Sequence, residues 1–425
     1  MPGKAGAIFV NSGPAYLLPS LDTRTPTTVI LSKRVQKVKP SPTLAVTARA
    51  AQLKAEGKDI ISLGAGEPDF DTPSHIADAG VEAIRKGLTR YTAVDGTAEL
   101  KDAIIAKFKR ENGLTYARNQ ILVSSGAKQT CYNVCAALLD PGDECLIPAP
   151  YWVSYPDMAL LADATPVTVY AGPDQGYKVT PAQLEAAITP RTKLLFLNSP
   201  SNPTGAAYSV AELKAIGAVL ERHPRVIIAA DEMYEHIYWA REPFQSFAQA
   251  NPALYERTVT INGVSKAYAM TGWRIGYCGG PKDLVAAMAT VQGQSTSNPS
   301  SISQRAATVA LNGDQRCVAD MNRAFRERHD FVVAALNAMP GIACRPGAGT
   351  FYAFADVHGA MQRLGLADDN AFAEYLLEAG VAVVPGSGFG APAHMRISFA
   401  TSMAQLEEAM RRIERAVSAP IAKRA

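Results

Sequence analysis

The sequence predicts an α/β fold in which a large, doubly wound and mostly parallel sheet is joined to a small α+β domain. Short segments of apolar and β-branched residues alternate with helical patterns from residue 97 to residue 278, which is typical of parallel strands covered by helices on both faces. Longer amphipathic helices replace this alternation towards the end of the chain. With 425 residues, of which 48% are hydrophobic, the chain can form two or three structural units.

Seven segments have the length and composition of buried strands. Strands hidden on both faces need no alternation of polar and apolar residues, and these segments show little. They are residues 120–126, 144–148, 166–170, 193–198, 225–231, 258–262 and 275–278. Strands that alternate with helices over such a length predict a doubly wound sheet.

Helical patterns fill the intervals between these segments. Residues 97–113 carry apolar residues at four-residue spacing, with Thr97 as a suitable N-cap and Gly113 as a suitable stop. Residues 126–143 predict a second helix. Its two cysteines have neither CxxC spacing nor a nearby histidine, so we assign them to the helix core and predict no metal site.

The second part of the chain predicts a smaller α+β unit. A long charged helix over 322–339 precedes three short strand-like segments and a closing amphipathic helix over 402–417. A helical stretch over 43–57 fits the same unit, which would then contain both ends of the chain. The predicted division is a disordered tail at 1–30, an arm and part of the small domain at 31–75, the large domain at 76–315 and the small domain at 316–425.

Composition excludes several classes of function. Because the 42 basic and 39 acidic residues nearly cancel, we expect no nucleic-acid partner. No apolar run approaches the roughly 18 residues of a membrane span, and the early apolar stretch at 5–19 is interrupted by polar residues. Six cysteines in so long a chain indicate reduced thiols rather than a disulfide scaffold. We therefore expect a globular protein of the cytoplasm.

Polar residues follow the predicted strands at the positions where open α/β sheets bind their ligands. Ser125, Gly126, Ala127 and Lys128 open a helix after the first strand, and its N-terminus would suit a phosphate. Further polar residues follow three later strands. These are Asn202, Asp231, Tyr234, Ser265, Lys266 and Arg274.

Lys266 is the most informative of these residues. The chain from Arg257 to Lys282 carries four cations and no Asp or Glu, so no carboxylate nearby in the sequence neutralises the lysine. Screening from water beside other cations favours a neutral amine, which condenses with aldehydes. Pyridoxal phosphate contains a group for each of these sites. It has an aldehyde for Lys266, a phosphate for the helix N-terminus and a pyridine nitrogen for Asp231. The residues therefore indicate this cofactor.

Several motifs, in order, resemble the fold-type I pyridoxal-phosphate aminotransferases of the class I and II family, most closely the bacterial aspartate aminotransferases of subgroup Ib. The resemblance runs from about Val35 to the last helix. It implies reversible, ping-pong transfer of an amino group between L-aspartate and 2-oxoglutarate. The motifs are LGAGEPDF, APYWVSYP, NSPSNPTG, DEMYEHI, SKAYAMTGWRIGY and MRISFATS.

The resemblance also implies roles for single residues. Lys266 would bind the cofactor aldehyde and move the proton of the substrate α-carbon, and Asp231 would hold the pyridine nitrogen protonated. Asn202 and Tyr234 would hydrogen-bond the phenolic oxygen, and Trp152 would stack on the ring. The residues expected to hold the phosphate are Gly126, Ala127, Lys128, Ser265, Arg274 and, from a second subunit, Tyr91.

The reach of Tyr91 into another subunit implies a homodimer with composite sites. Arg396 would bind the α-carboxylate of the amino acid or 2-oxo acid as a bidentate anchor, with a backbone contact at Gly66. Residues 289–299 lack the arginine that binds the distal carboxylate in other branches of the family. The resemblance assigns that task to Lys128, with hydroxyl groups from Ser41 and Thr43.

Other functions stay open at this point. Lys39 matches a position linked to prephenate transamination in relatives, so prephenate or aromatic substrates, or dual activity, form the alternative. A non-catalytic regulator that binds pyridoxal phosphate is a second alternative, although retention of Lys266, Asp231 and Arg396 favours an enzyme. An NAD-linked dehydrogenase is disfavoured, because the glycine pattern around Gly64 lacks its third glycine.

Overall fold

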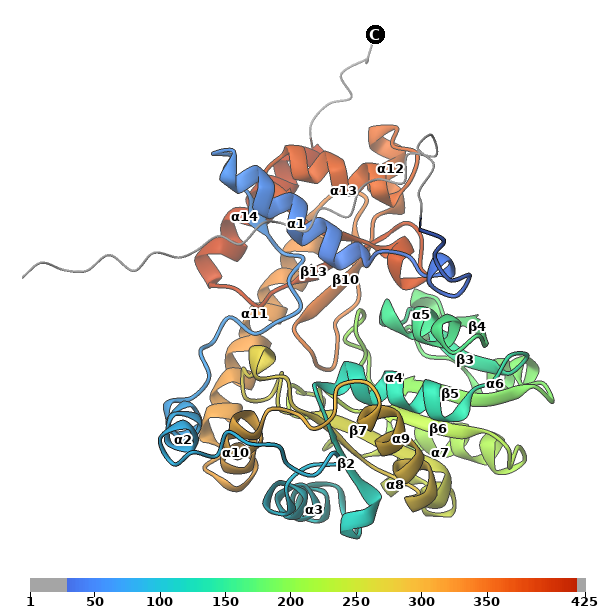
Figure 1. The fold of residues 1–425 in the computed structure, drawn as a ribbon. Coiled ribbons are helices and arrows are strands. Elements are labelled where there is room, and N and C mark those ends of the chain that lie inside the picture. Colours follow the sequence, from blue (N-terminus) through green and yellow to red (C-terminus); the bar gives the residue numbers. More distant parts are fainter. Residues whose placement is uncertain (1–28, 419–425) are drawn as a thin grey trace, which may run out of the picture.

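The structure is a computed structural model that describes residues 29–418. The predicted tail at 1–30 therefore lies almost entirely outside the described residues. Figure 1 shows a large domain built on a central sheet and a smaller domain above it. No helix of the described part is long and apolar enough to cross a membrane.

The large sheet contains seven strands in the order β2-β8-β7-β6-β5-β3-β4. The strands from β7 to β4 are parallel, whereas β8 runs antiparallel to both β7 and β2. The predicted mostly parallel sheet is thus confirmed, with the segment 275–278 as its antiparallel member. The strands are β2 Ile121–Ser124, β3 Glu144–Ala149, β4 Thr165–Tyr170, β5 Thr192–Asn198, β6 Ile227–Asp231, β7 Thr258–Gly263 and β8 Gly276–Gly279.

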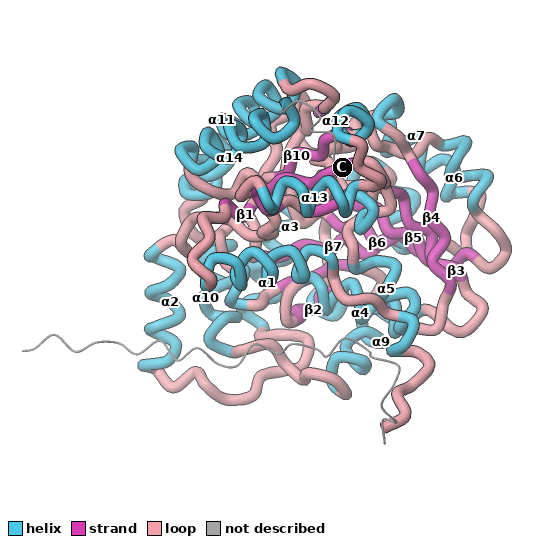
Figure 2. The backbone as a smooth tube through the Cα atoms, turned by 90° about the horizontal axis from the view of Figure 1, so that it is seen from above, coloured by secondary structure: helices cyan, strands magenta, loops and turns pink. Residues whose placement is uncertain are grey.

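Helices cover both faces of this sheet, as Figure 2 shows from above. Successive residues of β5 face opposite layers: Phe196 packs with α4, α5 and α9, and Leu197 packs with α6, α7 and α8. Helices α3 and α10 cover the end of the sheet that contains β2 and β8. The helices are α2 Ser74–Arg85, α3 Ala98–Asn112, α4 Ala127–Leu138, α5 Ser154–Leu161, α6 Pro181–Ala187, α7 Val210–Glu221, α8 Phe247–Ala250, α9 Lys282–Gly293 and α10 Ser301–Asn312.

Local signals set the ends of the helices predicted from the sequence. The Thr97 side chain accepts a hydrogen bond from the backbone N–H of Leu100, and Gly113 ends α3 in the left-handed region at φ 64°. Both predicted signals are confirmed. Thr97 supplies an acceptor for a free N–H at the start of the helix, and Gly113 supplies the left-handed residue that ends it. The cysteines Cys131 and Cys135 of α4 are fully buried in the core, as predicted.

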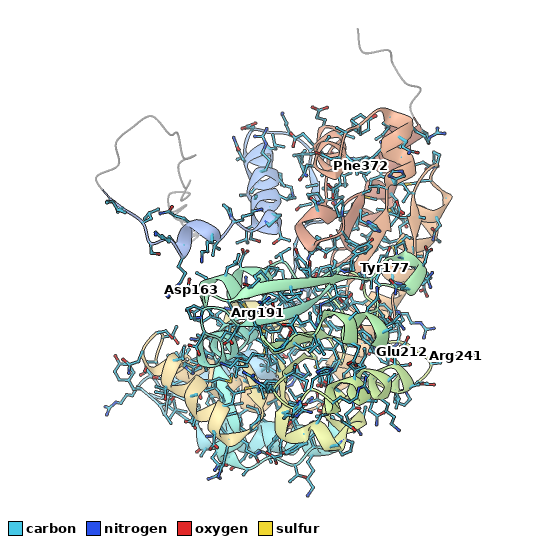
Figure 3. The ribbon with its side chains drawn as sticks, turned by 90° about the vertical axis from the view of Figure 1, so that its right-hand side faces the viewer. Asp163, Tyr177, Arg191, Glu212, Arg241 and Phe372 are labelled. Atoms are coloured by element: carbon cyan, nitrogen blue, oxygen red, sulfur yellow. The ribbon has the colours of Figure 1, made fainter. Side chains whose placement is uncertain are left out.

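The small domain combines elements from both parts of the chain. The early strand β1 pairs with the late strand β11 in parallel, and a separate four-stranded sheet has the order β12-β13-β10-β9. Phe372 belongs to the core beneath its helices (Figure 3). The elements are β1 Ile61–Ser62, β9 Ala343–Cys344, β10 Tyr352–Asp356, β11 Val381–Ala382, β12 Val384–Pro385, β13 His394–Ser398, α1 Pro42–Ala55, α11 Arg316–Ala338, α12 His358–Leu364, α13 Asp369–Glu378 and α14 Met403–Ser418.

The pairing of β1 with β11 supports the division that the sequence suggests. Residues 31–75 contribute α1 and β1 beside the elements of 316–418, whereas α2 packs against α10 of the large domain. We therefore propose residues 76–315 as the large domain and 31–75 with 316–425 as the small domain. The chain crosses between the two through residues 63–73, which brings that segment to the boundary.

Candidate active site

A pocket of about 460 Å³ lies where the two domains meet, beyond the ends of β5, β6 and β7. Its lining comes from the large domain, the small domain, the crossing segment and α1. Twelve of the residues singled out in the sequence line it. They are Thr43, Gly66, Ala127, Lys128, Trp152, Asn202, Asp231, Tyr234, Ser265, Lys266, Arg274 and Arg396.

Asp231 is the last residue of β6 and is buried. Its carboxylate accepts a hydrogen bond of 2.5 Å from the Tyr155 hydroxyl and one of 3.2 Å from the backbone N–H of Met233. Burial raises the pKa of Asp231, and these two hydrogen bonds act in the opposite direction. Tyr155 was not predicted as a site residue, although it stands within the motif that contains Trp152.

Lys266 lies in the turn after β7, and its amine donates to the backbone carbonyl of Gly66 at 2.5 Å. Burial among protein groups lowers the pKa of Lys266 to about 8, and Arg274 and Arg396 act in the same direction. Glu67 and Asp231 oppose this shift. The site therefore makes the neutral amine more accessible than it is in water, although Glu67 of the distant crossing segment opposes this effect.

The N-terminus of α4 and Arg274 form one corner of the pocket. Arg274 is left-handed at φ 55°, and a Cβ at Gly126 would lie 2.0 Å from its guanidinium. Gly126 does not line the pocket, and its N–H donates to the carbonyl of Ser124 at 2.7 Å. Its contribution is thus the space that it leaves for Arg274. A guanidinium beside a helix N-terminus and the hydroxyl of Ser265 suits a phosphate group.

Arg396 on β13 has a side chain that is almost entirely buried at the back of the pocket. Its guanidinium donates to Asn202 at 3.0 Å and to the carbonyl of Gly64 at 2.8 Å, and it lies 4.3 Å from the ring centre of Tyr352. Its Nε has no partner among residues 29–418. Because a buried charge needs an opposite charge, this geometry suits the carboxylate of a bound acid.

Further residues hold these groups in place. The side chain of Asn198 accepts from the backbone N–H of Asn202 at 2.8 Å and donates to the carbonyl of Asp231 at 2.9 Å. The Tyr234 hydroxyl bonds that of Tyr352 at 3.1 Å. Asn198 could have been found from its place at the end of a strand. Tyr352 carried no signal, because a tyrosine in a strand-like segment is equally well explained as a core residue.

The entrance of the pocket is built from α1 and α4. Thr43 lines it beside Leu44 and Thr47, and the amine of Lys128 lies 5.0 Å from the ring centre of Trp152. Partial burial and Arg274 lower the pKa of Lys128. The lining residues are drawn from positions as far apart as α1 and β13, so folding alone brings them together.

Besides Gly126, three of the predicted site residues lie outside the pocket lining. Ser41 bonds the Thr43 hydroxyl at 2.8 Å, which places it directly behind the lining. Lys39 is exposed and lies near Asp157, whose pKa is raised by burial while Lys39 acts in the opposite direction. Tyr91 is 93% exposed in the single chain, so it does not contribute to the pocket of its own chain.

Comparison with known proteins gives one consistent result. The family model for aminotransferase class I and II matches residues 58–413. The chain is 59% identical over 390 residues to an aspartate/prephenate aminotransferase of Nitrosomonas europaea, covering 90% of this chain and 98% of the relative. It is 52% identical over 388 residues to an aspartate aminotransferase of Rhizobium meliloti, covering 90% of this chain and 95% of the relative.

Solved structures agree with these relatives. The crystal structure of an aspartate aminotransferase from Rhizobium meliloti superposes with a TM-score of 0.88 at 51% identity, covering 92% of this chain and 99% of that one. The aspartate aminotransferase of Thermus thermophilus with maleate gives a TM-score of 0.86 at 43% identity, covering 91% of this chain and 100% of that one. The fold is therefore shared over nearly the whole chain.

Proposed function

This chain belongs to the class I and II aminotransferase family, and we propose that it transfers the amino group between L-aspartate and 2-oxoglutarate. It is a fold-type I enzyme that depends on pyridoxal phosphate. Beyond membership of the family, we propose the substrate of this enzyme, the roles of single residues and its assembly as a homodimer.

One observation carries the choice of a dicarboxylic acid: Arg396 and Lys128 line the same pocket as Lys266. With Arg274 in the phosphate corner, the pocket holds four cations and two carboxylates, Asp231 and Glu67. Arg274 would face the cofactor phosphate, which leaves Arg396 and Lys128 for the two carboxylates of such an acid. The names of the relatives, aspartate and aspartate/prephenate aminotransferase, support the same class of substrate.

The residues of the pocket fit pyridoxal phosphate, which supplies an electron-withdrawing ring that stabilises negative charge at the substrate α-carbon. Asp231, held by Tyr155, keeps a proton on the ring nitrogen. Lys266 would use its neutral amine to take the proton from the substrate α-carbon and to deliver it to the aldehyde carbon of the cofactor, on the other side of the transferred nitrogen. Arg396 orients the substrate by its α-carboxylate, and Lys128 holds the distal carboxylate with help from Thr43.

The remaining cofactor contacts complete the proposal. Asn202 and Tyr234 hydrogen-bond the phenolic oxygen, and Trp152 stacks on the ring. The phosphate is held by Arg274, Ser265 and the N-terminus of α4, together with Tyr91 of a second subunit. The 93% exposure of Tyr91 in the single chain supports this placement. The enzyme would be a homodimer with composite sites, and we expect it in the cytoplasm.

Prephenate is a second candidate substrate. Leu44 is 67% exposed yet lines the pocket entrance, where its apolar side chain would pack on a ring. A flexible lysine such as Lys128 also accepts carboxylates in more positions than a bidentate arginine does. The relative from Nitrosomonas europaea carries both substrates in its name.

The deciding experiment compares kcat/KM for oxaloacetate and for prephenate, with glutamate as the amino donor on one preparation loaded with pyridoxal phosphate. We expect a clear preference for oxaloacetate. In Lys128→Gln the kcat/KM for oxaloacetate should fall by about tenfold or more, because a charge-assisted contact is lost. Equal use of prephenate would establish dual activity, and inactivity with both acids would refute the substrate while the cofactor chemistry stands.

A further inference from the structure

A buried cluster of charged residues lies beside the pocket without lining it. It is centred on Lys107 of α3, whose side chain is fully buried, and on Glu235, whose side chain is 3% exposed. Neither residue has a role in the chemistry described above. A fully buried ammonium group in the middle of a helix is costly unless its surroundings compensate it.

The contacts of Glu235 occupy both of its carboxylate oxygens. One oxygen accepts from the amine of Lys107 and, at 2.8 Å, from the side-chain amide of Asn262. The other accepts from the amide of Asn112 at 2.7 Å. Asn112 in turn accepts from Lys107 at 2.8 Å. The pair and the two amides therefore satisfy one another inside the protein.

These contacts connect one helix to the two segments that carry the reacting groups. Glu235 follows Tyr234 in the turn after β6, the strand that ends at Asp231. Asn262 belongs to β7, which leads to Lys266, and it also donates to the carbonyl of Glu232 at 3.1 Å. The turn after β6 bonds the backbone of β7 at Glu232, whose N–H donates to the carbonyl of Ile261 at 2.9 Å. The side chains of Asn112 and Asn262 reach the turn beyond this point.

The cluster is no metal site. Oxygen and nitrogen atoms of Glu111, Glu235 and His236 lie within 4.8 Å of one another. However, the ammonium of Lys107 bonds Glu235 and lies 3.6 Å from Glu111, while His236 bonds Glu111 at 2.9 Å. A positive charge of the protein itself thus occupies the position that a metal ion would need.

Stability alone gives a poor account of the pair. Buried ion pairs are often replaced by apolar residues of similar volume without loss of stability, whereas removal of one partner leaves the other buried and uncompensated. A network that ties two loops to one helix has a different effect, since it fixes the loops relative to each other. That relation matters here, because misplacement of reacting groups by about 1 Å can lower a rate by about a hundredfold.

We propose that Lys107 and Glu235 are positioning residues that hold Asp231 and Tyr234 in a fixed relation to Lys266. Glu235 lies in the turn after β6, and Lys107 of α3 holds its carboxylate. The same carboxylate of Glu235 accepts from Asn262 and so holds the end of β7. The inference rests on the dependence of the enzyme on pyridoxal phosphate and not on aspartate as its substrate.

The test replaces the charges and keeps the volumes in the double variant Lys107→Met/Glu235→Gln. We expect its thermal midpoint to stay near that of the wild type, while kcat falls by about tenfold to a hundredfold because the groups are misaligned. The pH midpoint of the absorbance change of the bound cofactor should shift, and the cofactor should dissociate faster. These two readouts need no substrate, so they are independent of the proposed substrate specificity.

A matched control is the double variant Lys101→Met/Asp95→Asn, which removes another ion pair of α3 that leads away from β6 and β7. It should leave the absorbance midpoint unchanged. If Lys107→Met/Glu235→Gln does not fold, the single variant Glu235→Asp provides the same readouts, because it keeps a charge opposite Lys107 while shortening the reach to Asn112 and Asn262. A folded variant at Glu235 with wild-type kcat, cofactor retention and absorbance midpoint would overturn the proposal.

Discussion

The floor and the entrance of the pocket are built differently. The floor, defined by Tyr155, Asn198, Asp231 and Lys266, lies at strand ends or packs against them, and its polar groups are tied by side-chain hydrogen bonds. The entrance, defined by Thr43, Leu44 and Thr47, lies on the exposed face of α1. The first set is fixed by a packed sheet, and the second by one surface helix.

This difference suggests that the floor and the entrance have different functions. A group that must hold a proton or a ring at one place gains from rigid support, because small displacements reduce the rate. A group that only selects among acids can be replaced without disturbing the cofactor. Changes at the floor should therefore affect turnover and cofactor retention together, whereas changes near the entrance should affect KM.

The largest effect should follow Lys266→Ala. Without the amine, proton transfer at the substrate α-carbon loses its acid–base group, so kcat should fall by about a thousandfold or more. Steady-state rates and borohydride reduction of the holoenzyme test this prediction. In the wild type the reduced cofactor should be found on Lys266 in a peptide map. A label on Lys128 instead would show that the floor has been assigned to the wrong lysine.

A smaller effect should follow Tyr155→Phe, which removes the 2.5 Å hydrogen bond to Asp231. Hydrogen bonds to charged groups contribute about 1.5–3 kcal/mol, so kcat or cofactor affinity should fall by about tenfold or more. The pKa of Asp231 should rise further, since this bond opposes the effect of burial. Cofactor release measured by absorbance checks the outcome, with Tyr170→Phe on the outer strand β4 as the control. An unchanged release rate would contradict the role of Tyr155.

The pH dependence of cofactor capture should show how Glu67 influences Lys266 at the floor of the pocket. Lys266 has a pKa lowered to about 8 by burial, and only the neutral amine attacks an aldehyde. The rate of cofactor capture should therefore rise with pH and level off above about 8. Glu67 raises the pKa of Lys266, so Glu67→Gln should move the midpoint to lower pH. A midpoint that moves upward would show that Glu67 does not act on Lys266 by its charge.

The smallest effect should come from the segment that precedes α1. Arg34 and Lys37 pair with Asp163 at 2.7 and 3.6 Å, and Figure 3 shows Asp163 beside the N-terminal segment. Because exposed ion pairs contribute little, Asp163→Asn should change KM by less than about threefold and leave kcat unchanged. Asparagine also tolerates the left-handed φ of 57° at this position.

Asp140→Asn, at another exposed carboxylate of the large domain, is the matched control for this variant. The change in KM should also appear in the wild type at high salt, which screens exposed pairs. Faster cofactor release in Asp163→Asn would contradict the different roles of entrance and floor, because it would show that a change near the entrance affects cofactor retention.

The sequence by itself determined the sheet, the ends of α3 and most of the cofactor side of the site. Strands that are apolar throughout require cover on both faces, and parallel strands place their carboxyl ends at one edge. Asp231 and Lys266, which follow neighbouring strands, were therefore predictable as neighbours. The helix ends were predictable because Thr97 and Gly113 satisfy local needs of the backbone.

Only the tertiary structure decided which residues support those groups. Gly66 meets Lys266 across 200 positions of the sequence, and Glu67 of the same segment faces the lysine, although no acid lies near it in the chain. The antiparallel direction of β8 and the buried pair of Lys107 with Glu235 were equally hidden. Such contacts depend on how domains and layers pack, and neither periodicity nor a local motif records the distance between segments far apart in the chain.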